Sequence, residues 1–243
     1  MEAKLYWFAA SHPSHAVRRM LECKGIDYRS VKIMPGMQRI QVRLLGFAGG
    51  TVPALRLDGR RIQGSRQIAS ALEELRPDPP LFPADPELRR QADEAERWGD
   101  EEFQDFPRRL FRWGLVQDVE LRRWLAAASG LPAPALTARL SGLNARYYAR
   151  LAHADEAAVR RDLAALPGAL DNADQLLAQG VLTVDPPNAA ALQVLCTVAA
   201  LESFSDLHDQ VASHSVAAPA RALFPDYPGP IPSFLPSSWL AGG

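Results

Sequence analysis

The order of short apolar runs and amphipathic segments in the first third of the chain restricts its fold more than any other feature. Residues 4–9 form an apolar and aromatic run, and residues 28–33 alternate with a period of two, so both predict strands. Between them, residues 13–24 place apolar side chains at helical spacing and stop at Gly25, a residue type that commonly closes helices. The chain therefore begins with a strand, a helix and a second strand.

The rest of this segment completes a small domain. It contains a mostly amphipathic piece at 39–45, two strand-like runs at 53–57 and 60–62 that flank Asp58-Gly59, and a helical pattern at 65–75. An Asp-Gly dipeptide between two such runs is a strong signal for a two-residue hairpin. A parallel βαβ unit followed by an antiparallel hairpin within about 75 residues predicts an α/β domain with a thioredoxin-like fold.

A cluster of prolines marks the end of this domain. Five of the 20 prolines fall within residues 77–86, a density that no helix can continue through. We therefore predict a first domain at 1–77, a linker at 78–87 and an all-α domain at 88–243. Helical periodicity recurs in the second half at 87–114, 116–129, 134–151, 155–179 and 188–207. Six prolines in the last 25 residues predict an extended tail that packs over the surface or ends in disorder.

Charge and cysteine content exclude several classes of protein. The 243 residues carry 27 Lys and Arg against 28 Asp and Glu, so there is no excess charge to favour a nucleic acid or an anionic membrane as a partner. The apolar stretches, such as residues 194–201, are far shorter than a membrane span, and the N-terminus does not resemble a secretory signal. Cys23 and Cys196 are far apart and have no CxxC spacing, so we expect no disulfide, no cysteine-based metal site and a cytoplasmic location.

The junction between the first strand and the first helix reads Ser11-His12-Pro13-Ser14. In a thioredoxin-like domain this helix end gathers free N–H groups and positive dipole. Serine stands at both positions that cysteines occupy in redox members, which excludes dithiol exchange by this motif and leaves an anion site suited to a ligand's thiolate. Alternatively, Ser11 only caps the helix. His12 and His15 are expected to face solvent, and no third ligand makes them a metal pair.

Two further segments combine turn residues with a strand or a helix. Residues 49–55 read GGTVPAL, where a cis proline would turn the backbone N–H and C=O of Val52 outward to pair with an extended peptide; a trans proline at a strand start is the alternative. Ser65 begins an amphipathic helix, where its hydroxyl and free N–H groups would bind a carboxylate. The alternative is again a simple helix cap.

Together these segments resemble the glutathione transferase family. The stretches LYWFAASHPSHAVRRMLECKGIDY, TVPALRLDG and GSRQIASALEEL look like the N-terminal domain of these enzymes, and the helical half behind a proline-rich linker matches the family as well. The turn that leads to Asn188 resembles the N-cap of the buried central helix of the family. The resemblance implies that Ser11 stabilises the glutathione thiolate, that Val52 and Pro53 hold the cysteinyl backbone, and that Gly64 and Ser65 bind the γ-glutamyl carboxylate.

Two departures from the family pattern stand out. The family usually has Glu, Asp or Gln immediately before the helix-opening serine, to meet the γ-glutamyl amine, and this chain has Gly64. An acid from a partner subunit of a homodimer would be a substitute. The buried helix of the family usually has Asp three residues after its N-cap, and this chain has Ala191, so a capping box is incomplete.

The resemblance implies glutathione as co-substrate and a hydrophobic electrophile bound between the two domains, with no metal. Candidates for the electrophile site are His12 and side chains from the first long helix: Trp98, Phe103, Phe106, Arg108, Arg109 and Trp113, although helix packing alone would explain the aromatic ones. One alternative function is a non-catalytic protein that binds glutathione or apolar ligands. Another is a reductase or lyase that works through a mixed disulfide, and the missing active-site cysteine argues against it.

Overall fold

The computed structural model describes residues 2–240, and its first third is a four-stranded sheet with three helices. The elements are β1 (Ala3–Trp7), α1 (His12–Cys23), β2 (Arg29–Lys32), α2 (Gln38–Leu44), β3 (Ala54–Leu57), β4 (Arg60–Gln63) and α3 (Ser65–Leu75). Each corresponds to a predicted segment, with ends that differ by at most two residues.

The sheet has the order β2-β1-β3-β4. Strand β1 pairs in parallel with β2 and antiparallel with β3, and β3 and β4 form the hairpin around Asp58-Gly59. Successive side chains of β1 point to opposite faces. Leu5 joins the core shared with α1 and α3, whereas Tyr6 packs in a small cluster with Val42 of α2. The predicted thioredoxin-like fold is confirmed.

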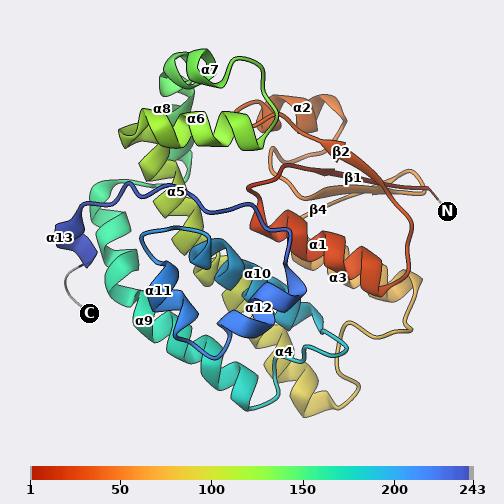
Figure 1. Cartoon of the computed structure of the whole chain (residues 1–243). Helices are drawn as coiled ribbons and strands as arrows, with labels where there is room; N and C mark the ends of the chain where they lie inside the picture. The colour runs from red at the N-terminus through yellow and green to blue at the C-terminus, as the bar shows by residue number, and fades with distance from the viewer. Residues whose placement is uncertain (1, 241–243) are drawn as a thin grey trace.

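The second part of the described chain is helical (Figure 1). It contains α4 (Pro86–Trp98), a π-helical turn η1 (Gly99–Phe103), α5 (Asp105–Gln117), α6 (Val119–Ala128), α7 (Pro134–Leu140), α8 (Gly142–Leu151), α9 (Glu156–Ala178), α10 (Ala189–Glu202), α11 (His208–Ala212), α12 (Ala217–Leu223) and α13 (Ser237–Leu240). No helix within residues 2–240 is long and apolar enough to cross a bilayer.

Several helix boundaries differ from the expected ones. The predicted helix at 87–114 divides at the π-helical turn, where Gly99 lets α10 approach: a Cβ there would lie 3.1 Å from Gln193 and 3.2 Å from Val194. The predicted helix at 134–151 divides at Ser141, and the one at 188–207 ends at Glu202. Helix α4 already begins at Pro86, capped by the Asp85 carboxylate, so the connector ends two residues before the expected 87.

Helix α10 is the centre of the molecule. All 14 of its residues are buried, and it packs against α1, α4 and α12 (Figure 1). The C-terminal segment after α12 runs in extended form across the surface and ends at α13 (Figure 1). Ile231 forms a bridge with Phe204, and the rings of Phe234 and Trp239 lie against Trp113. The tail therefore packs on the surface through residue 240, and residues 241–243 lie outside the described part.

Candidate active site

Ser11 is the N-cap residue of α1, but its side chain does not cap the helix. Ser11 is 6% exposed, and its hydroxyl accepts a hydrogen bond from the Ser14 hydroxyl over 2.8 Å. Within residues 2–240 the Ser11 hydroxyl donates to no acceptor, so its own proton is available to a ligand. The geometry therefore argues against side-chain capping as the role of this serine.

The backbone at this helix end offers fewer free donors than a typical N-terminus. The N–H groups of Ser14 and His15 both donate to the Ser11 carbonyl, over 3.0 and 3.3 Å, and Pro13 has no N–H. Among the described residues this leaves the His12 N–H without an acceptor in the first turn. An anion beside Ser11 would therefore meet one hydroxyl and one amide, rather than the cluster of amides that the sequence suggested.

The expectation that His12 and His15 face solvent is wrong, because each is 5% exposed. The His15 Nε2–H donates to the Ala9 carbonyl over 2.8 Å, and its ring lies against those of Trp7 and Tyr227. Burial lowers the pKa of His15 to about 4. Burial and the charge of Arg108 hold the pKa of His12 well below its usual value, and its buried Nε2 has no hydrogen-bond partner within residues 2–240.

The stability of the protein is expected to fall as the pH is lowered from about 6.5 towards 4. In this window the unfolded chain protonates His15, with an ordinary value near 6.5, while the folded protein with a pKa of about 4 does not. The free energy of unfolding therefore decreases as the pH decreases, and His12 acts with the same sign. Glu96 opposes this trend, because burial raises its pKa to about 7 and the folded state then binds the extra proton.

The measurement is the midpoint of chemical unfolding as a function of pH, for the wild type and for His15→Gln. The variant is expected to show a shallower acid slope because one buried titrating group is gone. His208→Gln changes an exposed histidine and serves as the control. An equal slope in the wild type and His15→Gln would contradict the assignment.

The segment before β3 has the backbone form that the resemblance implies. The Val52–Pro53 bond is cis, and among the described residues the N–H and C=O of Val52 make no hydrogen bond. The Gln63 side chain fixes this loop, since its Oε1 accepts from the Gly49 N–H over 2.8 Å and its Nε2 donates to the Thr51 carbonyl over 2.7 Å. Gln63 is thus occupied by the loop and does not replace the acid missing at position 64.

The start of α3 forms the second polar group of the site. Gly64 is the N-cap residue, at φ +93°, a conformation that glycine adopts without strain. The Ser65 hydroxyl is buried and has no partner, and within residues 2–240 the N–H groups of Ser65, Arg66 and Gln67 donate to no acceptor. Because the hydroxyl is unpaired, it is not a helix cap. This end of α3 is suited to a carboxylate.

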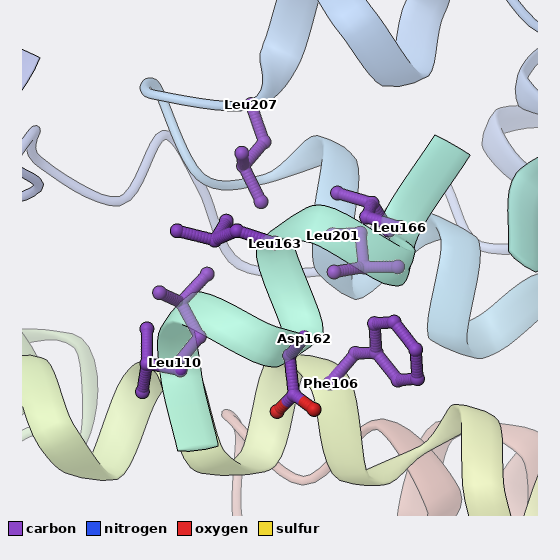
Figure 2. A pocket seen from close by; sticks show the side chains of 8 residues that line it. Phe106, Leu110, Asp162, Leu163, Leu166, Leu201 and Leu207 are labelled. Atoms are coloured by element: carbon purple, nitrogen blue, oxygen red, sulfur yellow. The ribbon is translucent and has the colours of Figure 1, made fainter. Parts of the chain in front are cut away.

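The aromatic candidates on the first long helix belong to packing contacts. Trp98 stacks on the fully buried Phe103 at 4.7 Å between ring centroids, and Phe103 contacts Phe106 edge-on. Phe106 also lines an apolar crevice with side chains of α9 and α10, among them Leu166 and Leu201 (Figure 2). The crevice has a volume of about 10 Å³, which does not admit an electrophile.

Arg109 and Trp113 lie on the same side of α5 as Phe106. The Arg109 guanidinium forms a bidentate salt bridge with Asp162 of α9, with hydrogen bonds of 2.6 and 2.8 Å, and donates a further hydrogen bond of 2.9 Å to Asp105. Trp113 is covered by Phe234 and Trp239. These contacts give Arg109 and Trp113 structural roles, so we do not retain Phe106, Arg109 or Trp113 as electrophile contacts.

A different face of α5 carries the positively charged side chains of Arg108 and Arg112. Arg108 influences the titration of His12, and Arg112, one helical turn later, lies with its guanidinium 4.9 Å from the ring centroid of Tyr148 on α8. Sequence reasoning named Arg108 but missed Arg112 and Tyr148. Arg112 could have been found from its spacing, because it lies four residues after Arg108 on one helix. Nothing in the sequence indicated that Tyr148 of α8 would lie against it.

Three side chains of the types that bind metal ions lie together at a second place, apart from Ser11. Asp171, Asp174 and His214 lie within metal-ligand distance of one another among the described residues. Asp174 already accepts hydrogen bonds from the His214 ring, the Ser215 hydroxyl and the Val216 N–H. These bonds attach the segment before α12 to α9, which explains the arrangement without an ion.

Comparison with known proteins points to one family. The family described as glutathione S-transferase, N-terminal domain, matches residues 5–80. Maleylacetoacetate isomerase of Rattus norvegicus is 40% identical over 89 residues, which is 35% of this chain and 41% of that enzyme. The match thus spans about two fifths of the length of this curated relative.

Solved structures extend the similarity to the whole fold. A glutathione S-transferase from Rhodospirillum rubrum has a TM-score of 0.60 at 20% identity, with 98% of both chains covered. A second from Sinorhizobium meliloti has a TM-score of 0.63 at 18% identity and covers 100% of this chain and 99% of its own. Residues 5–80 thus match the N-terminal domain of glutathione S-transferases, and the described chain has the fold of these solved structures.

Proposed function

We propose that the protein is a glutathione transferase, which uses the glutathione thiolate to attack a small electrophile or to displace its leaving group. The observation that carries this proposal is the Ser11 hydroxyl. It is oriented by Ser14, donates to no protein acceptor within residues 2–240 and stands at the start of α1 beside the free His12 N–H. These two donors would hold the sulfur.

The other groups of the site fit the rest of the tripeptide. The unbonded N–H and C=O of Val52, beside the cis Pro53, would pair with the cysteinyl backbone of glutathione. The buried, unpaired Ser65 hydroxyl and the free amides of α3 would receive the γ-glutamyl carboxylate. Each of these groups lacks a protein partner among the described residues, which supports a ligand at this place.

These donors can supply the free energy needed to stabilise the glutathione thiolate. A free thiol of pKa about 8.5 is only about 3% ionised at pH 7, and lowering its pKa by two units takes roughly 2.7 kcal/mol of preferential stabilisation of the thiolate. A hydrogen bond from a hydroxyl to a charged sulfur contributes roughly 1.5–3 kcal/mol, and a helix N-terminus roughly 0.3–1 kcal/mol. Because the Ser14 hydroxyl donates to the Ser11 oxygen, the Ser11 proton becomes a better donor. No general base is needed.

Replacement of Ser11 by alanine is expected to lower kcat/KM at pH 7 by about ten- to a hundredfold, because the thiolate loses its charge-assisted hydrogen bond. The pH profile of the rate should move to higher pH. The measurement is conjugation of 1-chloro-2,4-dinitrobenzene with glutathione, together with retention of each variant on immobilised glutathione. Ser14→Ala should show a smaller loss, because it removes only the orienting bond.

Ser213→Ala alters an exposed serine near the end of α11 and is the matched control. Wild-type kcat/KM in Ser11→Ala would remove Ser11 from the mechanism. Retention on glutathione without turnover of any electrophile in a panel would favour the alternative, a non-catalytic ligand-binding protein, for which the absent side chain at Gly64 is the supporting feature. Absence of both retention and turnover would refute the proposal.

We also propose that the protein acts as a homodimer in the cytoplasm. A partner subunit would be able to supply an acid for the γ-glutamyl amine, which Gly64 does not provide. The free thiols of Cys23 and Cys196 fit a reducing compartment. Light scattering on the purified chain measures the oligomeric state.

A further inference from the structure

Arg112 is a cation without a counterion. Its guanidinium makes no ion pair and no hydrogen bond within residues 2–240, although the side chain is half-buried against α8. Burial and the neighbouring charge of Arg108 lower the pKa of Arg112 to about 10. The Tyr148 ring offsets part of the cost of holding the charge in this place, and an anion would offset more of it.

The acids nearby are already used by other arginines. Asp105 accepts from Arg108 over 2.6 Å and from Arg109 over 2.9 Å, and Asp162 pairs with Arg109. Two of the three arginines of α5 thus occupy both carboxylates, and Arg112 pairs with neither.

The chain that follows α5 makes this region more basic. Residues 121–154, which form most of α6 and all of α7 and α8, contain five arginines and no aspartate or glutamate. The bundle of α6, α7 and α8 stands beside α2 of the first domain (Figure 1), and the Asn144 side chain donates to the Gly36 carbonyl over 3.0 Å. These arginines would attract anions to this side of the molecule.

Arg112 also has a spatial link to the proposed thiolate site. Ser11 is followed directly by His12, whose titration responds to Arg108, and Arg108 lies one turn from Arg112 on the same helix. The buried Nε2 of His12 is another polar atom without a partner in the described chain. The arginine of α5 whose charge acts on His12, the neighbour of Ser11, thus lies one helical turn from Arg112.

From this arrangement we infer that the second substrate carries a carboxylate, which the Arg112 guanidinium binds beside the Tyr148 ring while the Ser11 hydroxyl holds the glutathione sulfur. The inference rests on the proposed function and adds the chemical class of the electrophile. Arginine suits this task because its planar fork meets a carboxylate with two parallel hydrogen bonds. Arg112 would set specificity and leave the attack of the sulfur unchanged.

The test compares two electrophiles that differ in one group, 4-chloro-3-nitrobenzoate and 4-chloro-3-nitrobenzamide. Each kcat/KM is divided by the uncatalysed rate with glutathione, to remove the intrinsic difference in reactivity. The ratio of benzoate to benzamide is expected to fall by about ten- to a hundredfold in Arg112→Gln, mainly through KM, and to fall less in Arg112→Lys. The benzamide carries no charge for Arg112 to bind, so its normalised kcat/KM should fall much less than that of the benzoate in both variants.

Arg123→Gln removes an exposed arginine paired with Glu120 on α6, so it tests whether any loss of positive charge has the same effect. An unchanged ratio in Arg112→Gln, or an equal fall in Arg123→Gln, would overturn the inference. Quenching of tryptophan fluorescence by 3-nitrobenzoate and by 3-nitrobenzamide supplies a second readout that needs no turnover. If neither electrophile reacts, glutathione retention and the wider panel of electrophiles decide the proposed function, and fluorescence decides the inference: tighter binding of the benzoate that is lost in Arg112→Gln supports the anion site, and equal binding of the two compounds overturns it.

Discussion

Lys24→Met is expected to destabilise the protein by about 3–5 kcal/mol, because it removes one partner of a buried ion pair. The Lys24 side chain is fully buried, and its ammonium donates to Glu73 of α3 and to the carbonyls of Pro77 and Pro79, the last over 2.6 Å. Methionine fills most of the volume of the stem but leaves the Glu73 carboxylate and both carbonyls without their donor. The measurement is the free energy of unfolding from denaturant titration.

Two variants separate this effect from general sensitivity. Arg19→Met breaks an exposed ion pair with Glu22 on the same helix, and we expect it to cost less than about 1 kcal/mol. Glu73→Gln added to Lys24→Met keeps an acceptor for the Leu81 N–H while it removes the unpaired charge, so part of the loss should be regained. A loss for Lys24→Met no larger than that for Arg19→Met would show that the pair is not a stabilising contact.

Local patterns predicted the first domain well, because each of its elements is short and bounded by turn residues. Alternation in 28–33, the Asp58-Gly59 hairpin and the glycine that closes α1 each depend on neighbours in sequence, and the structure has them where expected. The buried state of His12 and His15 was not predictable in this way. The surroundings of both depend on distant residues: the Tyr227 ring of the C-terminal segment lies against His15, and the charge of Arg108 on α5 lowers the pKa of His12.

The helical half shows the same limit. Periodicity identified its helices, but the break at Gly99 depends on the close approach of α10, some ninety residues further along the chain. Periodicity also does not say which face of α5 meets which helix. Arg109 therefore looked as available as Arg108, and only the bonds to Asp162 show that it is engaged in the contact with α9.

Asn188→Ala is expected to cost about 2–4 kcal/mol, because the Asn188 side chain makes two buried hydrogen bonds at the start of α10. Its Oδ1 accepts from the Ala191 N–H and its Nδ2 donates to the Val181 carbonyl, both over 2.8 Å. With alanine, a buried N–H and a buried C=O lose their partners. The predicted N-cap is thus present. Because Ala191 offers no reciprocal side-chain bond, the cap consists of the Asn188 side-chain amide.

The matched control is Asp85→Ala, which removes the exposed cap of α4 and should cost about 1 kcal/mol. Asn188→Asp keeps the acceptor for Ala191 but loses the donor to Val181, so an intermediate loss is expected. Equal losses for Asn188→Ala and Asp85→Ala, measured by denaturant unfolding, would contradict a special role for the buried cap.

The Lys24 pair and the Asn188 cap meet at Leu81, a buried residue of the connector. Its N–H donates to the Glu73 carboxylate over 2.9 Å, and its carbonyl accepts from the Ala189 N–H at the start of α10 over 2.8 Å. One residue thus joins α3 of the first domain to the central helix of the second. Because the two substitutions act on the same short segment, their losses should not add, and the double variant Lys24→Met/Asn188→Ala should show a coupling of about 0.5–3 kcal/mol. Additive losses would mean that the connector transmits nothing between the domains, and that their relative position is set by other contacts, chiefly that of α1 with α10.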